Sequence, residues 1–178
     1  IIAYFDHVHI IREIFFNLEG LSNEPELKQK EVTAAVELIC NYSMVDNYEH
    51  QSVISIHKLV QEVVQIQLKN ERRSEATLRD ALQLIIRMKE KKNLKVCNAH
   101  GISVYLSSLE LRELVTDFDA YPLMILQHLE ESGRYLMAFN FANQIKGRFK
   151  SVLGPDHRST TSLLFKVAVS YGNLGKYK

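Results

Sequence analysis

The stretch ISIHKLVQEVV, residues 54–64, places a single histidine between a strand-like pattern and a helix-like pattern. Apolar residues alternate with polar ones up to His57, which is typical of a strand. Beyond it, Leu59, Val60 and Val63 continue from Ile56 at helical spacing, which predicts one buried stripe on a helix. A histidine at a helix N-terminus can donate an N–H to a phosphate, favoured by the helix dipole. The alternative is a histidine that caps the helix or packs without binding a ligand.

Other residue types that could do chemistry lack partners. His7 and His9 alternate as on a strand, but no cysteine or carboxylate cluster completes a set of metal ligands. A Cys–His hydrolase could use Cys40 or Cys97 with His57 or His100, but the sequence around neither cysteine is typical of a nucleophile. The chain has no G-x-x-x-x-G-K-[ST] loop to hold phosphates. We therefore expect no catalytic residue, no metal ligand and no cofactor in this chain.

Composition narrows the class of protein. With 46% hydrophobic and 24% charged residues and a net charge of +1, the 178 residues favour a globular protein without a strong field for nucleic acid or membrane. No apolar run is long enough for a membrane span, and residues 1–16 do not resemble a signal peptide, so we expect a cytoplasmic protein. Three prolines and seven glycines favour long helices. The chain starts without Met and stops within a repeat, so we expect a segment of a longer protein.

The elements around His57 predict a small mainly α domain, residues 1–70, that carries one β-hairpin. Helical spacing runs over Ile10–Leu18, and a second helix follows, with one buried stripe made by Val32, Ala35, Val36 and Ile39. The strands Ser43–Val45 and Ser52–Ile56 flank the polar stretch Asp46–Gln51, which predicts the hairpin. The order helix, helix, hairpin, helix is that of a winged helix.

A winged helix that binds DNA would carry Lys and Arg on the helix entering the major groove. The candidate helix, residues 27–41, has only Lys28 and Lys30, surrounded by Glu26, Glu31 and Glu37. Nucleic-acid binding is therefore not expected.

Connecting helices are predicted over residues 71–120, where Leu78, Leu82 and Ile85 face inward. Residues 121–178 contain an internal repeat, because Gly-Arg-Tyr at 133–135 returns as Gly-Lys-Tyr at 175–177, 42 residues later. Repeated pairs of helices at a fixed period predict an α-solenoid, with Ala138 and Ala168 allowing close helix packing. Glu130-Glu131 is expected on a solvated face.

The last 26 residues resemble the kinesin-light-chain type of tetratricopeptide repeat. The matching residues are Leu153-Gly154-Pro155-Asp156-His157, Thr160, Val167-Ala168, Tyr171 and Gly175-Lys176-Tyr177. By helical phase Phe165, Val169 and Asn173 share one face, and the resemblance implies that this face lines the groove that holds a protein or peptide ligand. Packing against a neighbouring repeat is the alternative for Phe165 and Val169. This chain alone, with fewer than two repeats, would not form a full groove.

The first half resembles the winged-helix region of STAND-class signalling NTPases, in the NB-ARC branch with a repeat array as sensor. The matching residues are Tyr42-Ser43, Ile54-Ser55-Ile56-His57, Leu59-Val60-Gln61 and Val63. The start of the chain is also similar, with His7 where a proline is usual. His57 matches the histidine of the Met-His-Asp motif, with Ile56 and Lys58 in place of Met and Asp. The resemblance implies that this imidazole contacts the β-phosphate of ADP in the parent protein and stabilises its closed state.

Together the resemblances imply a non-catalytic regulatory segment that couples a tetratricopeptide sensor array to an upstream nucleotide-binding domain. ADP or ATP would be bound by the parent protein, not by this chain alone. The alternative function is a stand-alone helical-repeat adaptor or effector that binds protein partners without a nucleotide switch. A phosphate-binding loop upstream of Ile1 would distinguish the two.

Overall fold

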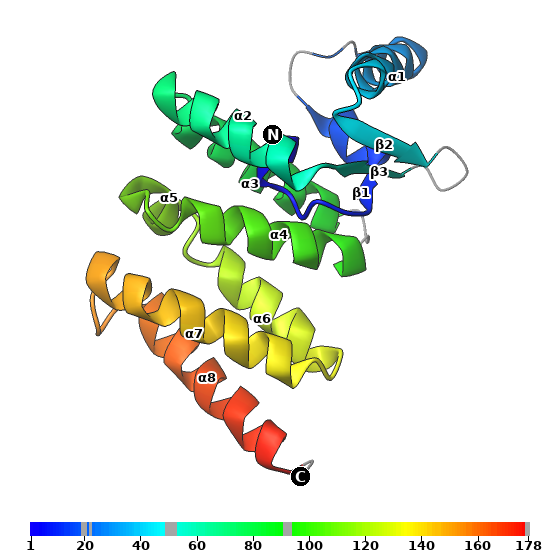
Figure 1. Cartoon of the computed structure of the whole chain (residues 1–178). Helices are drawn as coiled ribbons and strands as arrows, with labels where there is room; N and C mark the ends of the chain where they lie inside the picture. Colours follow the sequence, from blue (N-terminus) through cyan, green and yellow to red (C-terminus); the bar gives the residue numbers. More distant parts are fainter. Residues whose placement is uncertain (19–20, 22, 49–52, 91–93, 177–178) are drawn as a thin grey trace. The chain divides into compact units, whose positions relative to one another are not determined.

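The computed structural model describes residues 1–18, 21, 23–48, 53–90 and 94–176. It is mainly α-helical with a small antiparallel sheet, which confirms the predicted fold class (Figure 1). The helices are α1 (Pro25–Asn41), α2 (Lys58–Asn70), α3 (Ser74–Glu90), α4 (Leu94–Ser108), α5 (Arg112–Asp117), α6 (Tyr121–Glu131), α7 (Tyr135–Val152) and α8 (Arg158–Lys176). The strands are β1 (Ile10–Ile11), β2 (Val45–Tyr48) and β3 (Val53–Ile56), and the short 3-10 helices are η1 (Ile2–Tyr4) and η2 (Arg12–Asn17).

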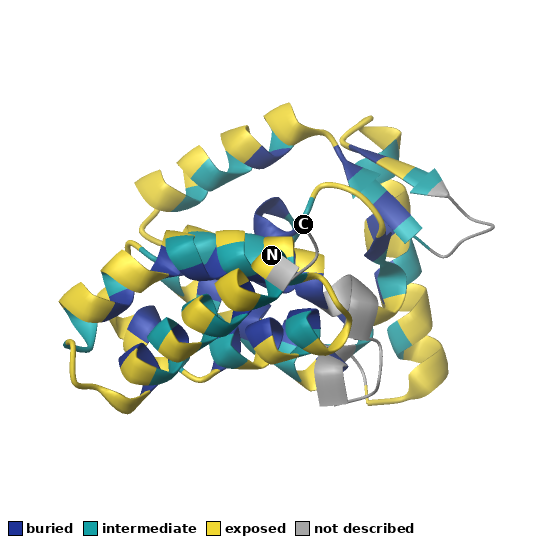
Figure 2. Ribbon diagram, turned by 90° about the horizontal axis from the view of Figure 1, so that it is seen from below, coloured by how far each residue is buried: buried dark blue, intermediate teal, exposed yellow. Residues whose placement is uncertain are grey.

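The chain folds as two compact units, unit 1 (Ile1–Val104) and unit 2 (Tyr105–Lys178). The predicted division at residues 70 and 120, into winged-helix-like, connecting and repeat regions, stays a prediction. Buried and exposed residues alternate along the helices of both units (Figure 2). No helix within the described ranges has both the length and the apolar character that crossing a bilayer requires.

The sheet of unit 1 has the strand order β1-β3-β2, with both pairs antiparallel. The predicted hairpin is present as β2 and β3, but Asp46 lies in β2 opposite Ser55 rather than in the turn. Ile54 and Ile56 are buried and Ser55 is half-buried, as period-2 alternation requires. The sheet therefore supplies one apolar face to the core of unit 1.

The predicted helix over Ile10–Leu18 is wrong. Ile10 and Ile11 pair with Ile54 and Val53 as strand β1, and the short helix η2 follows. His9 has a φ of 56°, in the left-handed region, so the chain turns there and enters the sheet. Pairing with β3, a contact distant in sequence, overrides the helical spacing.

Helix α1 begins at Pro25, where the missing N–H of proline costs nothing, but only part of its predicted stripe is buried. Val32 and Val36 are buried, whereas Ala35 is exposed and Ile39 is half-buried. These four residues line an open apolar cavity of about 190 Å³, together with Ile2, Phe15, Leu21, Glu31 and Ile54. The predicted stripe of α1 therefore lines this cavity and is only partly covered by other side chains.

Unit 2 consists of antiparallel neighbouring helices, with α6 against α7 and α7 against α8 (Figure 1). Helix α6 ends at Gly133, whose φ of 72° is left-handed, and the amide of Arg134 donates to the carbonyl of Leu129. This is the Schellman ending that glycine permits without strain. Ala138 and Ala142 are buried between the helices, as predicted for Ala138, but Ala168 on α8 is exposed, contrary to prediction.

Candidate functional site

His57 lies at the junction between β3 and α2, as the sequence predicts. Its backbone N–H donates to the carbonyl of Met44 at 3.4 Å, and its carbonyl accepts the N–H of Gln61 at 3.1 Å. The imidazole makes no capping hydrogen bond to the helix. Its side chain is 54% exposed, with Nε2 3.9 Å from a carboxylate oxygen of Asp46. The ring is therefore accessible at the N-terminal end of α2.

This placement suits an interaction with an anion. The first backbone N–H groups of α2 point out of the helix N-terminus, where the helix dipole favours negative charge. Lys58, the next residue, is exposed and adds a positive charge. The negative charge of Asp46 disfavours a bound anion, because its carboxylate is within ion-pair distance of the ring. The ADP contact of His57 stays a prediction.

Helix α2 buries only part of its predicted stripe. Leu59 is 71% exposed, Val63 56% and Ile66 61%, so these three residues form an exposed apolar stripe, the α2 stripe. The predicted inward positions Leu59 and Val63 are therefore wrong, while Ile56 is buried and Val60 is half-buried.

Two glutamines hold the inward side of α2. Gln61 is 7% exposed, and its amide nitrogen donates to the carbonyls of Ile2 at 3.1 Å and Phe5 at 3.0 Å. Gln65 donates in the same way to the carbonyl of Ala3 at 2.6 Å. These glutamines give donors to buried and half-buried backbone carbonyls in and beside η1, one of which, that of Ile2, also accepts the N–H of Phe5.

In unit 2 the residues predicted to contact a ligand all lie on α8 at four-residue spacing. Phe165 is 70% exposed, whereas Val169 and Asn173 are half-buried. The structure thus brings the three onto one helix face, and their role as ligand contacts stays a prediction. Tyr171 on the same helix is 68% exposed, and its ring lies 5.8 Å from that of Phe139 on α7.

A polar link between α6 and α8 was missed by sequence reasoning. One carboxylate oxygen of Glu130 accepts from Nζ of Lys166 at 2.8 Å, and the other accepts from the hydroxyl of Ser170 at 3.0 Å. The side chains of Glu130 and Lys166 are only 15% and 21% exposed. Glu130 is therefore not on a solvated face, whereas Glu131 is exposed. Lys166 and Ser170 are four residues apart and therefore share a face of α8. This spacing is the feature of the sequence that could have predicted a single acidic partner for both side chains.

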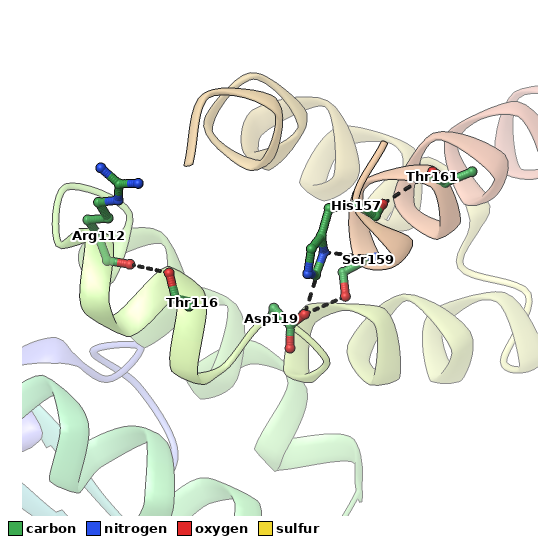
Figure 3. A network of polar contacts seen from close by, with 6 residues as sticks. All are labelled: Arg112, Thr116, Asp119, His157, Ser159 and Thr161. Atoms are coloured by element: carbon green, nitrogen blue, oxygen red, sulfur yellow. Dashed lines mark hydrogen bonds and ion pairs between the residues drawn. The ribbon is translucent and has the colours of Figure 1, made fainter. Parts of the chain in front are cut away.

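Ser159, His157 and Asp119 come together at the start of α8 (Figure 3). The hydroxyl of Ser159 donates to the carboxylate of Asp119 at 2.5 Å, and Nδ1 of His157 accepts the backbone N–H of Ser159 at 3.2 Å. Nδ1 of His157 is 3.9 Å from the Asp119 carboxylate. The serine hydroxyl donates to that carboxylate and not to the imidazole. A nucleophilic serine requires a serine–histidine hydrogen bond, so this cluster caps α8 rather than forming a catalytic triad.

The remaining candidate chemistry is dispersed. Within the described parts of the chain, no three His, Cys, Asp or Glu side chains gather in a way that could hold a metal ion. Cys40 is half-buried on α1, and the side chain of Cys97 lies outside the described residues. His100 is buried at 2% exposure.

Comparison of the chain with protein-family models, with curated proteins and with solved structures gave no match.

Proposed function

We propose that this chain is a non-catalytic regulatory and protein-interaction segment of a STAND-type signalling ATPase. Unit 2 contributes to a tetratricopeptide array that binds a protein or peptide ligand in the cytoplasm. Unit 1 carries the winged helix that meets the nucleotide-binding domain, with His57 beside the ADP phosphates. The observation that carries the proposal is the pairing of an accessible histidine at a strand-to-helix junction with helical hairpins in the same chain.

The packing of unit 2 supports the repeat assignment. Helix α7 contacts both α6 and α8, and α6 also contacts α8, which is the pattern expected when a helical hairpin is followed by the first helix of the next one. On α8 the residues Ala168, Gly172 and Gly175 are exposed. A Cβ added at either glycine would meet nothing within 4 Å. These small residues would let the second helix of the next repeat pack closely against α8. The exposed ring of Phe165 would be available to contact a ligand.

The surface of unit 1 supports contact with another domain. The α2 stripe begins two residues after His57, so an apolar surface and the proposed phosphate contact lie on one helix. Three large apolar side chains exposed in a row at the spacing of a helix face are typical of a protein interface.

The first test is the coding sequence upstream of Ile1. A G-x-x-x-x-G-K-[ST] loop there supports the ATPase assignment, and its absence would leave the adaptor function, with the same interaction surfaces and no nucleotide switch.

Where the loop is present, the His57→Ala variant of the full-length protein should lose bound ADP faster than the wild type, measured by nucleotide release. His7→Ala is the matched control, because the side chains of His7 and His57 are equally exposed, at 54%. Equal ADP retention in the two variants would remove the sensor role from His57.

The second test concerns the ligand groove. Peptides selected from a display library against the full-length protein should bind at least tenfold more weakly to the Phe165→Ala variant, since buried aromatic anchors carry much of the binding energy. Leu136→Ala on α7 is the control, because Leu136 is 61% exposed and lies on a different helix. Equal affinity of the Phe165→Ala and Leu136→Ala proteins would exclude this face as the groove.

A further inference from the structure

His100 is buried against the N-terminal segment, defined here as Ile1–His9. Its ring stacks on that of Phe5, with centroids 5.3 Å apart and planes inclined by 28°. Phe5 is itself 2% exposed and also stacks on Phe15, at 6.5 Å. The imidazole is therefore part of the apolar contact by which the N-terminal segment lies on unit 1.

The two ring nitrogens of His100 have unequal surroundings. Nε2 lies 3.4 Å from the carbonyl oxygen of His9, so Nε2 carries the proton and donates. Nδ1 is buried, and no hydrogen-bond partner reaches it from the part of the chain that the structure describes. The neutral ring with its proton on Nε2 suits these surroundings, because leaving the Nδ1 lone pair without a donor costs less than burying an N–H without an acceptor. A second proton on Nδ1 would create such an N–H and a buried positive charge.

The charged groups that act on the ring come from the segment it contacts. Burial is the strongest influence and opposes protonation of the ring. The hydrogen bond to the His9 carbonyl and the charge of Asp6 favour protonation, while the charge of the His9 side chain opposes it. The net result is a pKa of His100 below its ordinary value. Within the described residues these are the titratable neighbours whose influence on the ring is resolved.

The rest of the N-terminal segment is held by the buried side chains of Ala3 and Tyr4 and by hydrogen bonds that do not titrate. Its α-amino group does titrate: burial lowers the pKa of the Ile1 amine, while Asp80 raises it and Arg73 lowers it. Gln61 and Gln65 donate to the carbonyls of Ile2, Ala3 and Phe5, and the amide of Ile56 donates to the carbonyl of His7 at 2.9 Å. These hydrogen bonds can re-form with water when the segment lifts, at a net cost of about 1 kcal/mol each. Opening exposes the buried side chains of Ala3, Tyr4 and Phe5, whereas the strand pairs of the sheet begin at Ile10, after the segment.

We infer that His100 is an acid-sensitive latch: protonation of its ring releases the N-terminal segment from the rest of unit 1. Because the buried ring is stacked on Phe5, movement of Phe5 with the segment exposes a face of the ring to water and couples ring hydration to segment opening. The latch acts independently of the proposed nucleotide switch, since it needs no ligand. Its site is the stacked pair of His100 and Phe5 with the His9 carbonyl.

The direction with pH follows from linkage. In the open state the ring has the ordinary histidine pKa of about 6.5, and in the closed state its pKa is lower. The open state therefore binds the proton more readily. The closed state has its full stability above about pH 6.5 and loses it as the pH falls, by up to about tenfold in the opening equilibrium per pH unit.

Hydrogen exchange of the whole 178-residue chain at pH 7.5 and pH 5.5, corrected for the intrinsic exchange rate, tests the latch. We expect the amides of Tyr4 and Phe5, which donate to carbonyls within the segment, to open several-fold more at pH 5.5. Amides of α7 should not change. His100→Phe should reduce the pH dependence while keeping the stack on Phe5, leaving the share that comes from the buried Ile1 amine. His57→Gln, an exposed control, should retain the wild-type pH dependence.

Three outcomes would overturn the latch. The His100→Phe protein could open with the wild-type pH dependence. All of unit 1 could open together, which would mean global unfolding rather than release of a segment. Finally, the ring resonances of His100 in the wild-type protein could titrate by NMR at the ordinary histidine value. The NMR titration needs no variant, so it tests the latch even if the His100→Phe protein does not fold. His100→Gln is a second substitution for the exchange experiment.

Discussion

Units 1 and 2 attach their helices in different ways. In unit 2 the inward faces of α6 and α7 are apolar, with Leu129 and Phe149 completely buried. In unit 1 the inward face of α2 is mixed: the amide of Gln61 binds backbone carbonyls beside the half-buried Val60, while Leu59 and Val63 face outward. The comparison shows that apolar periodicity locates the apolar face of a helix but does not say whether that face is inside.

The ends of the helices differ in the same way. Helix α6 ends with Gly133 in the left-handed region, whereas α1 and α2 end with Ser43 and Arg72 there, at φ values of 54° and 58°. All three endings have the same bond, an amide donating to the carbonyl five residues before it. Unit 1 therefore accepts a backbone conformation that is unfavourable for residues with a Cβ.

The largest expected effect tests the apolar packing of unit 2. Phe149→Ala should lower the free energy of unfolding by about 3–5 kcal/mol, because the ring is fully buried and its loss leaves a cavity. Phe165→Ala should change it by less than about 1 kcal/mol, since that ring is 70% exposed. Urea unfolding followed by circular dichroism measures both. Similar losses in the two variants would mean that α8 is covered on its Phe165 side.

The second prediction compares a partly buried ion pair in unit 2 with a more exposed one in unit 1. Glu130→Gln should cost roughly 1–3 kcal/mol, because Lys166 keeps its charge at 21% exposure without the carboxylate. Glu75→Gln removes the carboxylate 3.4 Å from Arg79, and should cost under about 0.5 kcal/mol because both groups are better solvated. Thermal unfolding of both variants gives the difference, and equal shifts would show that the α6–α8 link contributes no more than a surface pair.

The third prediction tests the polar attachment of α2. Gln61→Ala should destabilise unit 1 by about 1–3 kcal/mol, since the carbonyls of Ile2 and Phe5 lose a buried donor. Gln67→Ala is the control on the same helix, where the amide reaches only the exposed Glu71, and should stay within about 0.5 kcal/mol. Hydrogen exchange of α2 and η1 measures the change. A neutral Gln61→Ala would show that apolar contacts hold the helix after all.

The smallest expected effects concern the helix ends. Gly133→Ala should cost about 1 kcal/mol, because alanine is strained at a φ of 72°. Arg72→Gly should raise stability by up to about 1 kcal/mol for the opposite reason. Melting temperatures of the two proteins should therefore move in opposite directions, and movement in the same direction would contradict the conformational argument.

Sequence reasoning performed best where contacts are local. Three predictions follow from neighbours within a few residues and are present in the structure: the hairpin, the strand-to-helix change at His57, and the inward positions Leu78, Leu82 and Ile85. It failed for Ile10 and Ile11, because their partners in β3 are more than forty residues away. It also missed the position of Glu130, whose partners lie on a helix 36 to 40 residues further on.

The candidate site divides along the same line. By itself the sequence determined that His57 ends a strand and begins a helix, and that Phe165, Val169 and Asn173 share a helix face, because dihedral preference and helical period are local properties. Only the tertiary structure decided which side of α2 is exposed, and that the ring of His100 is buried against Phe5. Those outcomes depend on where the η1 carbonyls and the N-terminal segment come to lie, and unpaired backbone groups and desolvation are set by distant neighbours.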